Sequence, residues 1–405
     1  MKDDFLHSHS DTIVNSHHHE NIGASRKTRL LVVIPYFYPR IGGAENYAYH
    51  IAQLFQESGS YDVTVVTSNY ETNEYRKETI DGLQVHRLPA SLHISNTPVN
   101  HSWYREFSRI YDAVNPDIVN IHTPVPFMGD VAALALKRRC PLVVTYHAGS
   151  MLKGKMPEDI VISVYEKFFL PMLFRRADAV VPVSEYFFSS GLGKGFEEKM
   201  HVIRPGVDIS RYIPTPLPSP ARTITYVGRI EHSSNWKGIE ELFQAMKLVL
   251  LRRPDAILEM IGGGDALAYV KSRARDLGIG ESVVFFGPQA GKDVIDAYRR
   301  SNVFVLPSTS EAEQSSISLV EAMASGRPVI GTRVGGTPYI LKHEENGLLV
   351  EPKDSVALAD AIVRILEDVS LAERLAKGAR ADAEDVDWSS QIRKYRHLFN
   401  SLLGV

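Results

Sequence analysis

The strongest constraint on the fold is an alternation of short apolar runs with helical patterns, which occurs twice along the chain. In the first half, an apolar run at 31–34 precedes a glycine-containing turn and a helical pattern from 44 to about 57. Short apolar runs are typical of strands buried on both faces of a sheet. Strands that alternate with helices predict a parallel, doubly wound α/β sheet. Further strands of this half are expected at residues 62–67, 118–121, 142–146 and 179–183.

A proline-rich segment separates the two halves. Residues 213–220 hold four prolines in eight positions, and proline removes a backbone donor and biases its neighbour away from helix. We therefore expect an interdomain linker. After it the pattern restarts, with a helix at 238–251 and a closing helix from about 389 to 403. Strands are expected at residues 223–227, 257–261, 283–286, 303–306 and 328–330.

Two Rossmann-like domains facing each other across a cleft follow from this arrangement. We expect an N-terminal domain at 30–212, joined by the closing helix at 389–405, and a C-terminal domain at 213–388. Ligands of such sheets bind at the carboxyl ends of the strands, so the cleft is the expected site. Residues 1–29 are polar and without periodicity, which predicts a disordered tail rather than a metal site. The tail carries His7, His9, His17, His18 and His19.

Composition excludes several classes of protein. The chain has 45 basic and 48 acidic residues, whereas a dedicated nucleic-acid binder usually carries a basic excess. Its single cysteine, Cys140, excludes an intramolecular disulfide and a cysteine-based zinc site. No apolar stretch approaches the ~18 residues of a membrane span, and the first 29 residues lack the apolar core of a signal peptide. We expect a cytoplasmic protein.

Two cations stand at strand and helix ends in the second half. Gly228 and Arg229 follow the strand at 223–227, and Lys237 opens the next helix. Cations above a cleft can clamp a diphosphate. The alternative is an ordinary pair of solvated cations.

The helix expected at 315–325 provides a second candidate group. Its unpaired N-terminal amides and positive dipole end can receive a phosphate. Glu313 lies just before this helix and Glu321 about two turns into it, where carboxylates can accept hydrogen bonds from sugar hydroxyls. The alternative makes Glu313 a capping acid and Glu321 a surface acid.

Glycines and histidines also follow strands. Gly42 and Gly43 form a turn between a strand and a helix, and three glycines around Gly263 follow another strand, which suggests close backbone approach to a ligand. His122 and His147 each follow a strand of the first half, so both can face the cleft. A structural role for each histidine is the alternative.

These pieces, in this order, resemble family 4 of the retaining nucleotide-sugar glycosyltransferases, which adopt the GT-B fold. The resemblance covers roughly residues 30–400. Its motifs are the glycine pair after the first strand, Gly228-Arg229 with Lys237, and Glu313-x7-Glu321 followed by Ala-Met-Ala-x-Gly-x-Pro-Val-Ile. The turn at 204–208 resembles the Asn-Gly-Val-Asp turn of the family.

The resemblance implies roles on the donor side. Arg229 and Lys237 would bind the donor diphosphate and stabilise the leaving group. Glu321 would bond the nucleotide ribose, and Glu313 would contact hydroxyls of the transferred sugar. The remaining donor-side residues implied are Gly43, Gly228, Gly263 and the amides near Ser316 and Ile317, with His122 near the transferred sugar.

The resemblance further implies retention of the anomeric configuration, without a metal or another cofactor. No carboxylate nucleophile stands out in the sequence, which favours front-face displacement. Two departures from the family pattern are visible: Ser315-Ser316 replace an aromatic-Gly pair, and Tyr339 stands where a glutamate usually follows Gly-Gly-x-Pro. The first concerns the sugar pocket and the second a loop near the donor.

The acceptor is expected on the N-terminal side, near Gly42, His147 and Lys153. Residues 137–176 hold eight basic and three acidic side chains interleaved with apolar ones. A basic, apolar helix can lie on an anionic membrane; the alternative is a core helix with a solvated basic face. The segment from His147 to Gly154 resembles members that build cell-surface polysaccharides on lipid carriers. A glycan or lipid-linked acceptor at the inner face of a membrane is therefore expected.

Two other functions remain open. Nucleotide-sugar epimerases share this architecture but need no acceptor, so incubation with donor alone distinguishes them. A noncatalytic sugar-nucleotide binder is the third reading, and the presence of Arg229, Lys237, Glu313 and Glu321 argues against it.

Overall fold

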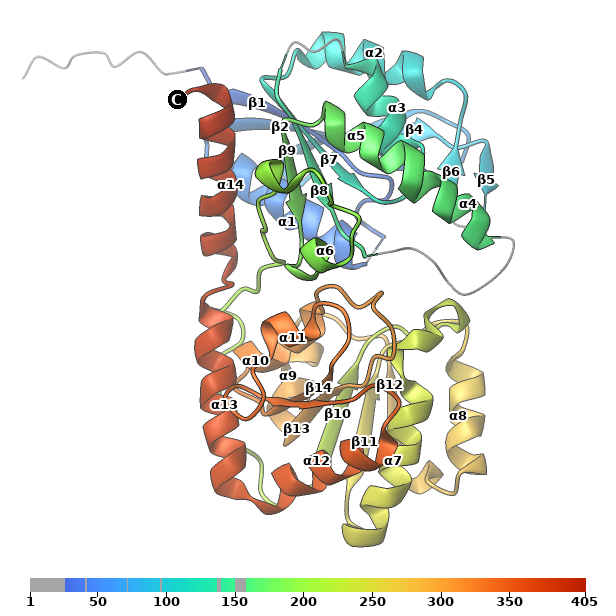
Figure 1. The fold of residues 1–405 in the computed structure, drawn as a ribbon, viewed down its shortest axis with the longest axis vertical. Helices are drawn as coiled ribbons and strands as arrows, with labels where there is room; N and C mark the ends of the chain where they lie inside the picture. The colour runs from blue at the N-terminus through green and yellow to red at the C-terminus, as the bar shows by residue number, and fades with distance from the viewer. Residues whose placement is uncertain (1–25, 41, 71, 95–96, 137–139, 150–157) are drawn as a thin grey trace, which may run out of the picture.

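The computed structural model describes residues 26–405, apart from residues 41, 71, 95–96, 137–139 and 150–157. Residues 1–25 of the tail predicted at 1–29, and the acceptor-side candidate Lys153, lie outside the described residues. The chain forms two α/β lobes stacked end to end, with the helices Val369–Glu384 and Trp388–Leu403 following one another along one side (Figure 1). The prediction of two Rossmann-like domains is thereby confirmed.

The N-terminal lobe is built on a seven-stranded sheet in the order β3-β4-β2-β1-β7-β8-β9. All neighbouring strands are parallel except the edge pair β3 and β4. Its strands are β1 (Thr28–Val33), β2 (Tyr61–Asn69), β3 (Arg76–Ile80), β4 (Leu83–Pro89), β7 (Ile118–Thr123), β8 (Leu142–Tyr146) and β9 (Ala179–Pro182), with β5 (Leu92–Ile94) and β6 (Thr97–Val99) as a separate hairpin.

The C-terminal lobe is built on a six-stranded parallel sheet in the order β12-β11-β10-β13-β14-β15. The central strands are buried because helices cover both faces. Its strands are β10 (Thr223–Val227), β11 (Ile257–Ile261), β12 (Val283–Gly287), β13 (Val303–Leu306), β14 (Val329–Thr332) and β15 (Leu348–Val350).

Helices flank both sheets. Those of the first lobe are α1 (Gly43–Glu57), α2 (Trp103–Val114), α3 (Met128–Ala135), α4 (Glu158–Val164), α5 (Leu170–Arg176) and α6 (Tyr186–Ser189), with a π-helical turn (Tyr165–Phe169) joining α4 to α5. Those of the second are α7 (Ile239–Arg252), α8 (Leu267–Asp276), α9 (Lys292–Arg300), α10 (Ile317–Ala324), α11 (Thr337–Ile340), α12 (Ser355–Glu367) and α13 (Val369–Glu384). The last helix is α14 (Trp388–Leu403).

The first strand begins earlier than predicted. Thr28 and Arg29, placed in the tail by the sequence, belong to β1. The Asp117 carboxylate accepts a hydrogen bond from the Arg29 amide at 2.8 Å and also pairs with Arg26. These polar contacts extend the first strand by three residues beyond the apolar run.

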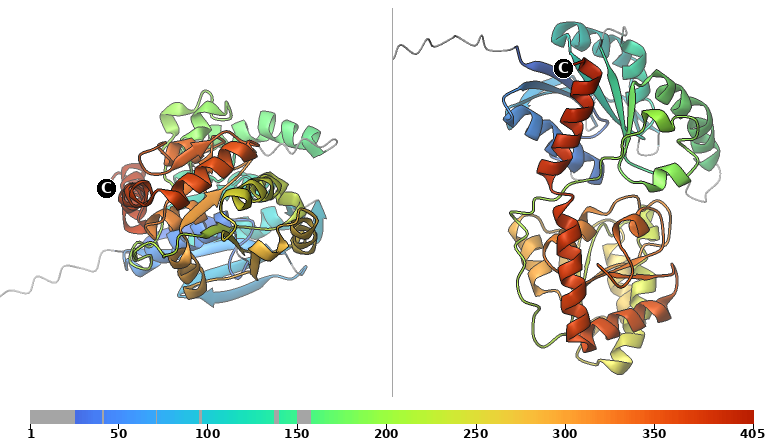
Figure 2. Two further views of the ribbon diagram at one scale, coloured as in Figure 1. Left: turned by 90° about the horizontal axis from the view of Figure 1, so that it is seen from below. Right: turned by 60° about the vertical axis from the view of Figure 1, so that its left-hand side comes forward.

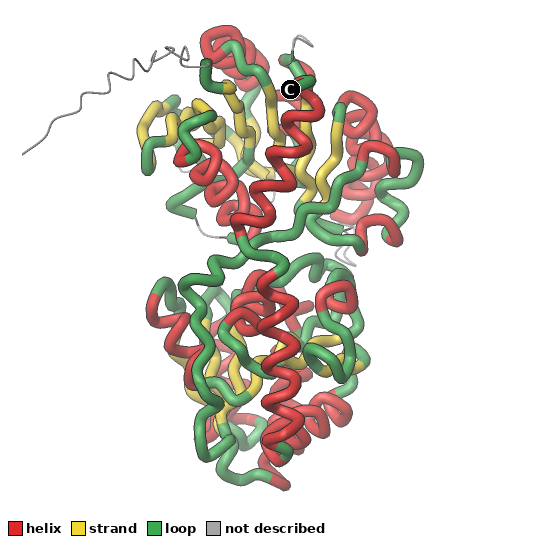
Figure 3. Tube along the Cα trace, turned by 90° about the vertical axis from the view of Figure 1, so that its left-hand side faces the viewer, coloured by secondary structure: helices red, strands yellow, loops and turns green. Residues whose placement is uncertain are grey.

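The chain passes between the lobes twice, as the turned views show (Figure 2, Figure 3). Residues 204–222 lead to the second lobe, and α14 returns to the first. Trp388, Tyr395 and Phe399 of α14 are buried in the core of the N-terminal lobe, against β1, β2 and α1. The Asp387 side chain caps α14 by accepting from the Ser389 amide at 2.8 Å. The expected crossover of the closing helix is confirmed.

Among the described helices, none is both long enough and apolar enough to cross a membrane.

Candidate functional site

An ion pair between Lys237 and Glu313 lies beyond the carboxyl ends of β10 and β13, at the inner edge of the C-terminal sheet. The Lys237 Nζ lies 2.7 Å from Glu313 Oε2, and both side chains are largely buried. The Ser308 hydroxyl donates to the same carboxylate oxygen at 2.7 Å. Glu313 is therefore no capping acid, and Lys237 is no solvated cation.

The local backbone holds this pair in place. Lys237 ends a 3₁₀ turn (His232–Lys237) rather than opening a helix, and Gly238 follows with a φ of +72°. A side chain on Gly238 would collide with the Pro307 carbonyl, so glycine permits the two loops to touch. The Thr309 amide donates to the Trp236 carbonyl at 2.7 Å. The loops after β13 and before α7 thus form one rigid unit.

Arg229 follows β10 at the same edge of the sheet. Its side chain is 58% exposed and lies 3.5 Å from Glu231. The adjoining Gly228 carbonyl faces Gly262 so closely that no side chain would fit there, and a side chain at Gly263 would lie 2.6 Å from Pro288. The sequence suggested that glycines here let the backbone approach a ligand. In the structure, Gly262 and Gly263 lie close to other parts of the protein, the Gly228 carbonyl and Pro288.

Helix α10 presents its N-terminus to the same region. Ser316 is its N-cap, since its hydroxyl accepts from the Leu319 amide, and Ile317 is the first helical residue. Glu321 accepts hydrogen bonds from Tyr212 at 2.7 Å and Tyr298 at 2.9 Å. Burial raises the pKa of Glu321, against the opposing effect of the two phenol donors. Glu321 is thus a held carboxylate rather than a surface acid, and sequence spacing gave no sign of its tyrosine partners.

On the N-terminal lobe, Gly43 is exposed and has open space where a side chain would extend. The Glu45 carboxylate folds back over Gly42. Burial raises the pKa of Glu45, while the charges of Arg40 and Arg229 oppose that rise. Since Arg229 belongs to the other lobe, opposite charges face each other across the cleft. Sequence analysis missed Glu45, although its position in the first turn after the glycine pair could have indicated it.

The two histidines form a direct pair. His122 Nδ1 lies 2.9 Å from His147 Nε2, and the rings stack with centroids 5.1 Å apart. His122 lies within β7 rather than after it, and its Nε2 contacts Asn120 at 3.2 Å. Burial lowers the pKa of His147 to about 3 and that of His122 well below its ordinary value. Both rings are therefore neutral near pH 7.

The histidine side of the N-terminal lobe touches the loop that carries Glu313. A side chain on Gly149, two residues after His147, would lie 2.5 Å from Gln314 Nε2 and 3.2 Å from the Glu311 carbonyl. The structure therefore brings the histidine pair and the Lys237–Glu313 pair to facing edges of one interlobe region.

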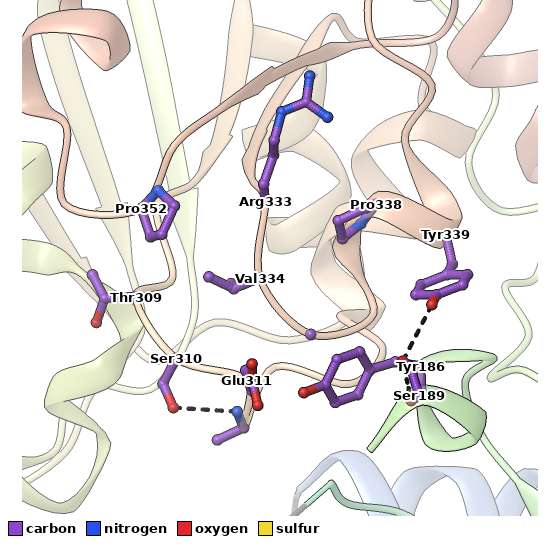
Figure 4. A pocket seen from close by; sticks show the side chains of 12 residues that line it. Tyr186, Ser189, Thr309, Ser310, Glu311, Arg333, Val334, Pro338, Tyr339 and Pro352 are labelled. Carbon is purple, nitrogen blue, oxygen red and sulfur yellow. Dashed lines mark hydrogen bonds between the residues drawn. The ribbon is translucent and has the colours of Figure 1, made fainter. Parts of the chain in front are cut away.

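A cavity of about 890 Å³ lies between the lobes beside this region (Figure 4). Tyr186 and Ser189 line it from α6, and Glu311, Arg333 and Tyr339 from the other lobe. The Tyr339 hydroxyl lies 3.3 Å from that of Ser189, and its carbonyl accepts from Arg204 at 3.0 Å. Tyr339, the departure from the family pattern, therefore joins the two lobes. Arg229 and Lys237 do not line this cavity.

Two family models match this chain. The model described as Glycosyltransferase Family 4 matches residues 41–211, and that described as Glycosyl transferases group 1 matches residues 214–382. Among curated proteins, D-rhamnosyltransferase WbpZ of Pseudomonas aeruginosa is 28% identical, over 90% of each chain. Sulfoquinovosyl transferase SQD2 of Arabidopsis thaliana is 25% identical, over 93% of this chain and 74% of the relative.

Solved structures share the fold. Sucrose-phosphate synthase from Thermosynechococcus elongatus superposes with a TM-score of 0.77 at 22% identity, covering 93% of this chain and 100% of that chain. HepE of Anabaena, solved in complex with UDP-glucose, gives a TM-score of 0.72 at 20% identity, covering 92% of this chain and 100% of that chain. Both family models, the curated relatives and these GT-B structures agree, so the chain belongs to the group 1 and family 4 glycosyltransferases.

Proposed function

We propose that this glycosyltransferase moves a sugar from a UDP-, GDP- or ADP-linked donor to an acceptor hydroxyl, with retention and without a metal, in the synthesis of cell-surface polysaccharide or glycolipid. The observation that carries the proposal is the Lys237–Glu313 pair at the inner edge of the C-terminal sheet, with Arg229 and the N-terminus of α10 beside it. The complex of HepE with UDP-glucose supports a nucleotide-sugar donor.

The chemical problem is the charge that develops on the leaving diphosphate. Cations held in a water-poor site stabilise such charge before the reaction begins, and losing one preorganised donor of this kind costs ~2.7–4 kcal/mol. Lys237 is held by Glu313, and Glu313 by Ser308. Arg229, more exposed, can turn toward the diphosphate. These cations and the amides at the start of α10 would replace a metal ion.

Glu313 has a second task in this proposal. Its Oε2 already accepts from Lys237 and Ser308, while a carboxylate offers about four acceptor positions. The remaining positions can bind hydroxyls of the transferred sugar, which would link sugar recognition to the cation that stabilises the leaving group. Glu321 would bind the ribose, and His122 would lie near the sugar. Attack from the side of the departing diphosphate gives retention.

Replacement of Lys237 by alanine tests the assignment. We expect transfer to fall by a hundredfold or more, in line with ~2.7 kcal/mol, while thermal unfolding stays cooperative. Lys247→Ala, an exposed lysine of α7, is the matched control and should transfer at the normal rate. Normal transfer by Lys237→Ala would remove Lys237 from the mechanism.

Donor choice and reaction class need a separate experiment. Thermal unfolding measured with a panel of UDP-, GDP- and ADP-sugars identifies the donor, because a ligand that binds only the folded state raises the melting temperature. The stabilising donor is then incubated with the protein alone. A rearranged sugar would show an epimerase, and transfer only in the presence of acceptor supports the proposal.

A further inference from the structure

One helical segment of the N-terminal lobe exposes an apolar ridge. Along α4, the π-helical turn and α5, the outward side chains are large and apolar: Ile160 is 51% exposed, Val164 44%, Phe168 62%, Phe169 46% and Met172 49%. Four of them recur at intervals of four residues, which places them on one side of a helix. We call these five side chains the apolar ridge. Exposed apolar groups that gather in this way mark an interaction surface.

The opposite face of the same segment is fixed in the core. Leu170, Leu173 and Phe174 are buried in the core between the N-terminal sheet and the helices that cover it. Tyr165, at the start of the π-helical turn, is also buried, and its hydroxyl donates to Asp130 at 3.2 Å. The extra residue of the π turn lets Tyr165 face inward while both Phe168 and Phe169 face outward. The apolar ridge is therefore held outward by a buried inner face.

Of the charged side chains at 159–176, the exposed ones are basic. Lys167 and Arg175 are exposed, and the Lys167 Nζ lies 5.8 Å from the centre of the Phe168 ring. Among the side chains of 159–176 whose exposure the structure describes, the acidic ones are only partly exposed. Lysine and arginine beside exposed aromatic and aliphatic groups match an anionic bilayer surface, where each cation contributes about 1 kcal/mol.

The position of the segment connects it with the site. His147 of the histidine pair follows β8 directly, and α4 is the next described helix along the chain. Figure 1 shows α4 at the edge of the N-terminal lobe that faces the second lobe. A bilayer lying on the apolar ridge would thus lie beside the acceptor side of the cleft.

We propose that the apolar ridge inserts into the interface of an anionic membrane, with Lys167 and Arg175 at the lipid headgroups, and so presents the acceptor side of the cleft to lipid-borne acceptors. A second copy of this chain suits the surface less, because a symmetric contact would bring the cations of both copies together. The lipid-borne acceptor rests on the proposed function, whereas membrane binding itself does not.

Flotation of the full chain with vesicles tests the proposal. We expect binding to phosphatidylcholine vesicles containing 30% phosphatidylglycerol, and about thirtyfold weaker binding after Lys167→Glu, which removes one cation and adds one anion. Phe168→Ser combined with Met172→Ser should abolish flotation even at low salt. Leu251→Ser, an exposed leucine of the other lobe, and Lys292→Glu, an exposed lysine of α9, are matched controls and should float like the unmodified chain.

Circular dichroism and donor-induced thermal stabilisation show in parallel that each variant folds and binds donor. Stabilisation by donor without vesicle binding would overturn this inference and leave the proposed function intact. Vesicle binding without stabilisation by any donor would support membrane binding and contradict the proposed function. Equal flotation of the apolar-ridge variants and the controls, or a change in molar mass by light scattering instead of flotation, would also overturn it.

Discussion

Glu45 shows how a single carboxylate can tune a site from the opposite lobe. It lies in the first turn of α1, folded over Gly42, and its charge acts on Arg229. In the absence of donor this carboxylate supplies negative potential where the proposed diphosphate must lie. The negative charge of Glu45 therefore weakens the attraction between Arg229 and a bound anion.

Replacement of Glu45 by glutamine should strengthen the binding of a nucleoside diphosphate, by about tenfold, because a nearby negative charge is removed. Titration calorimetry at low ionic strength measures the change. Glu57→Gln, an exposed residue in the last turn of the same helix, is the control and should leave the dissociation constant unchanged. Weaker binding by Glu45→Gln would show that the carboxylate contacts the ligand favourably.

The histidine pair makes stability depend on pH. The folded-state pKa of His147, about 3, lies below that of an unfolded histidine near 6.5. The unfolded chain therefore binds the proton first, and this contribution to stability is complete above pH 6.5 and declines as the pH falls toward 3. Each buried histidine can contribute up to about 1.4 kcal/mol per pH unit in that window.

Urea unfolding at pH 7 and pH 5 measures this effect. We expect His147→Asn to lose less stability between the two pH values than the unmodified chain does. His101→Asn, at an exposed position, should show the unmodified dependence. An unchanged slope in His147→Asn would mean that His147 becomes protonated in the folded protein.

At the scale of elements, the proline-rich linker is attached to the second lobe through Arg327. This side chain is fully buried, and burial lowers its pKa to about 10. Its guanidinium donates to the Thr215 hydroxyl at 3.0 Å and to the Ser301 carbonyl at 3.3 Å, and it also reaches the Thr215 carbonyl. One cation thus joins the linker to the end of α9.

Arg327→Met should destabilise the C-terminal lobe by about 3 kcal/mol or more, because several buried carbonyls lose their donor. Arg252→Met removes only the exposed pair with Asp360 and should cost less than about 1 kcal/mol. Denaturant unfolding followed by tryptophan fluorescence compares the two. Equal losses would show that the linker does not depend on Arg327.

The elements that sequence analysis predicted best are central strands. β8, β10, β11 and β13 were predicted at their observed bounds because they are apolar and buried on both faces. Strand β4 was missed because it carries His86 and Arg87, whose burial depends on partners such as Glu78. A strand that contains buried polar residues can be predicted only when the tertiary partners of those residues are known.

The site follows the same rule. The sequence placed Arg229 after the strand at 223–227, Lys237 at the start of the next helix and Glu313 just before the helix expected at 315–325. It could not show that Lys237 and Glu313 are paired, because 76 residues separate them and a Gly238 contact brings their loops together. The two tyrosine partners of Glu321 come from two other segments, Tyr212 from the linker and Tyr298 from α9, so sequence spacing could not show them either.

At the scale of the whole molecule, α14 completes the lobe from which the chain begins. Trp388 contacts Tyr47 and His50 of α1, and Gly206 leaves space for its indole. Tyr395 lies deeper, where its hydroxyl contacts that of Thr145 at 2.8 Å. The N-terminal core therefore depends on side chains supplied by α14.

Trp388→Ala should lower the stability of the N-terminal lobe by about 3–5 kcal/mol. Scanning calorimetry should then resolve a separate, earlier transition for that lobe. Ser401→Ala, an exposed residue of the same helix, should leave the trace unchanged. A single unshifted transition in Trp388→Ala would contradict the contribution of α14 to this core.

The two passages of the chain between the lobes are bonded to each other. The Val207 amide donates to the Val386 carbonyl at 3.1 Å, and the Trp388 amide donates to the Val207 carbonyl at 3.1 Å. Because the two passages are hydrogen-bonded to each other, they tie the lobes together along one side of the molecule. We expect substrates to reach the region between the lobes from the opposite side.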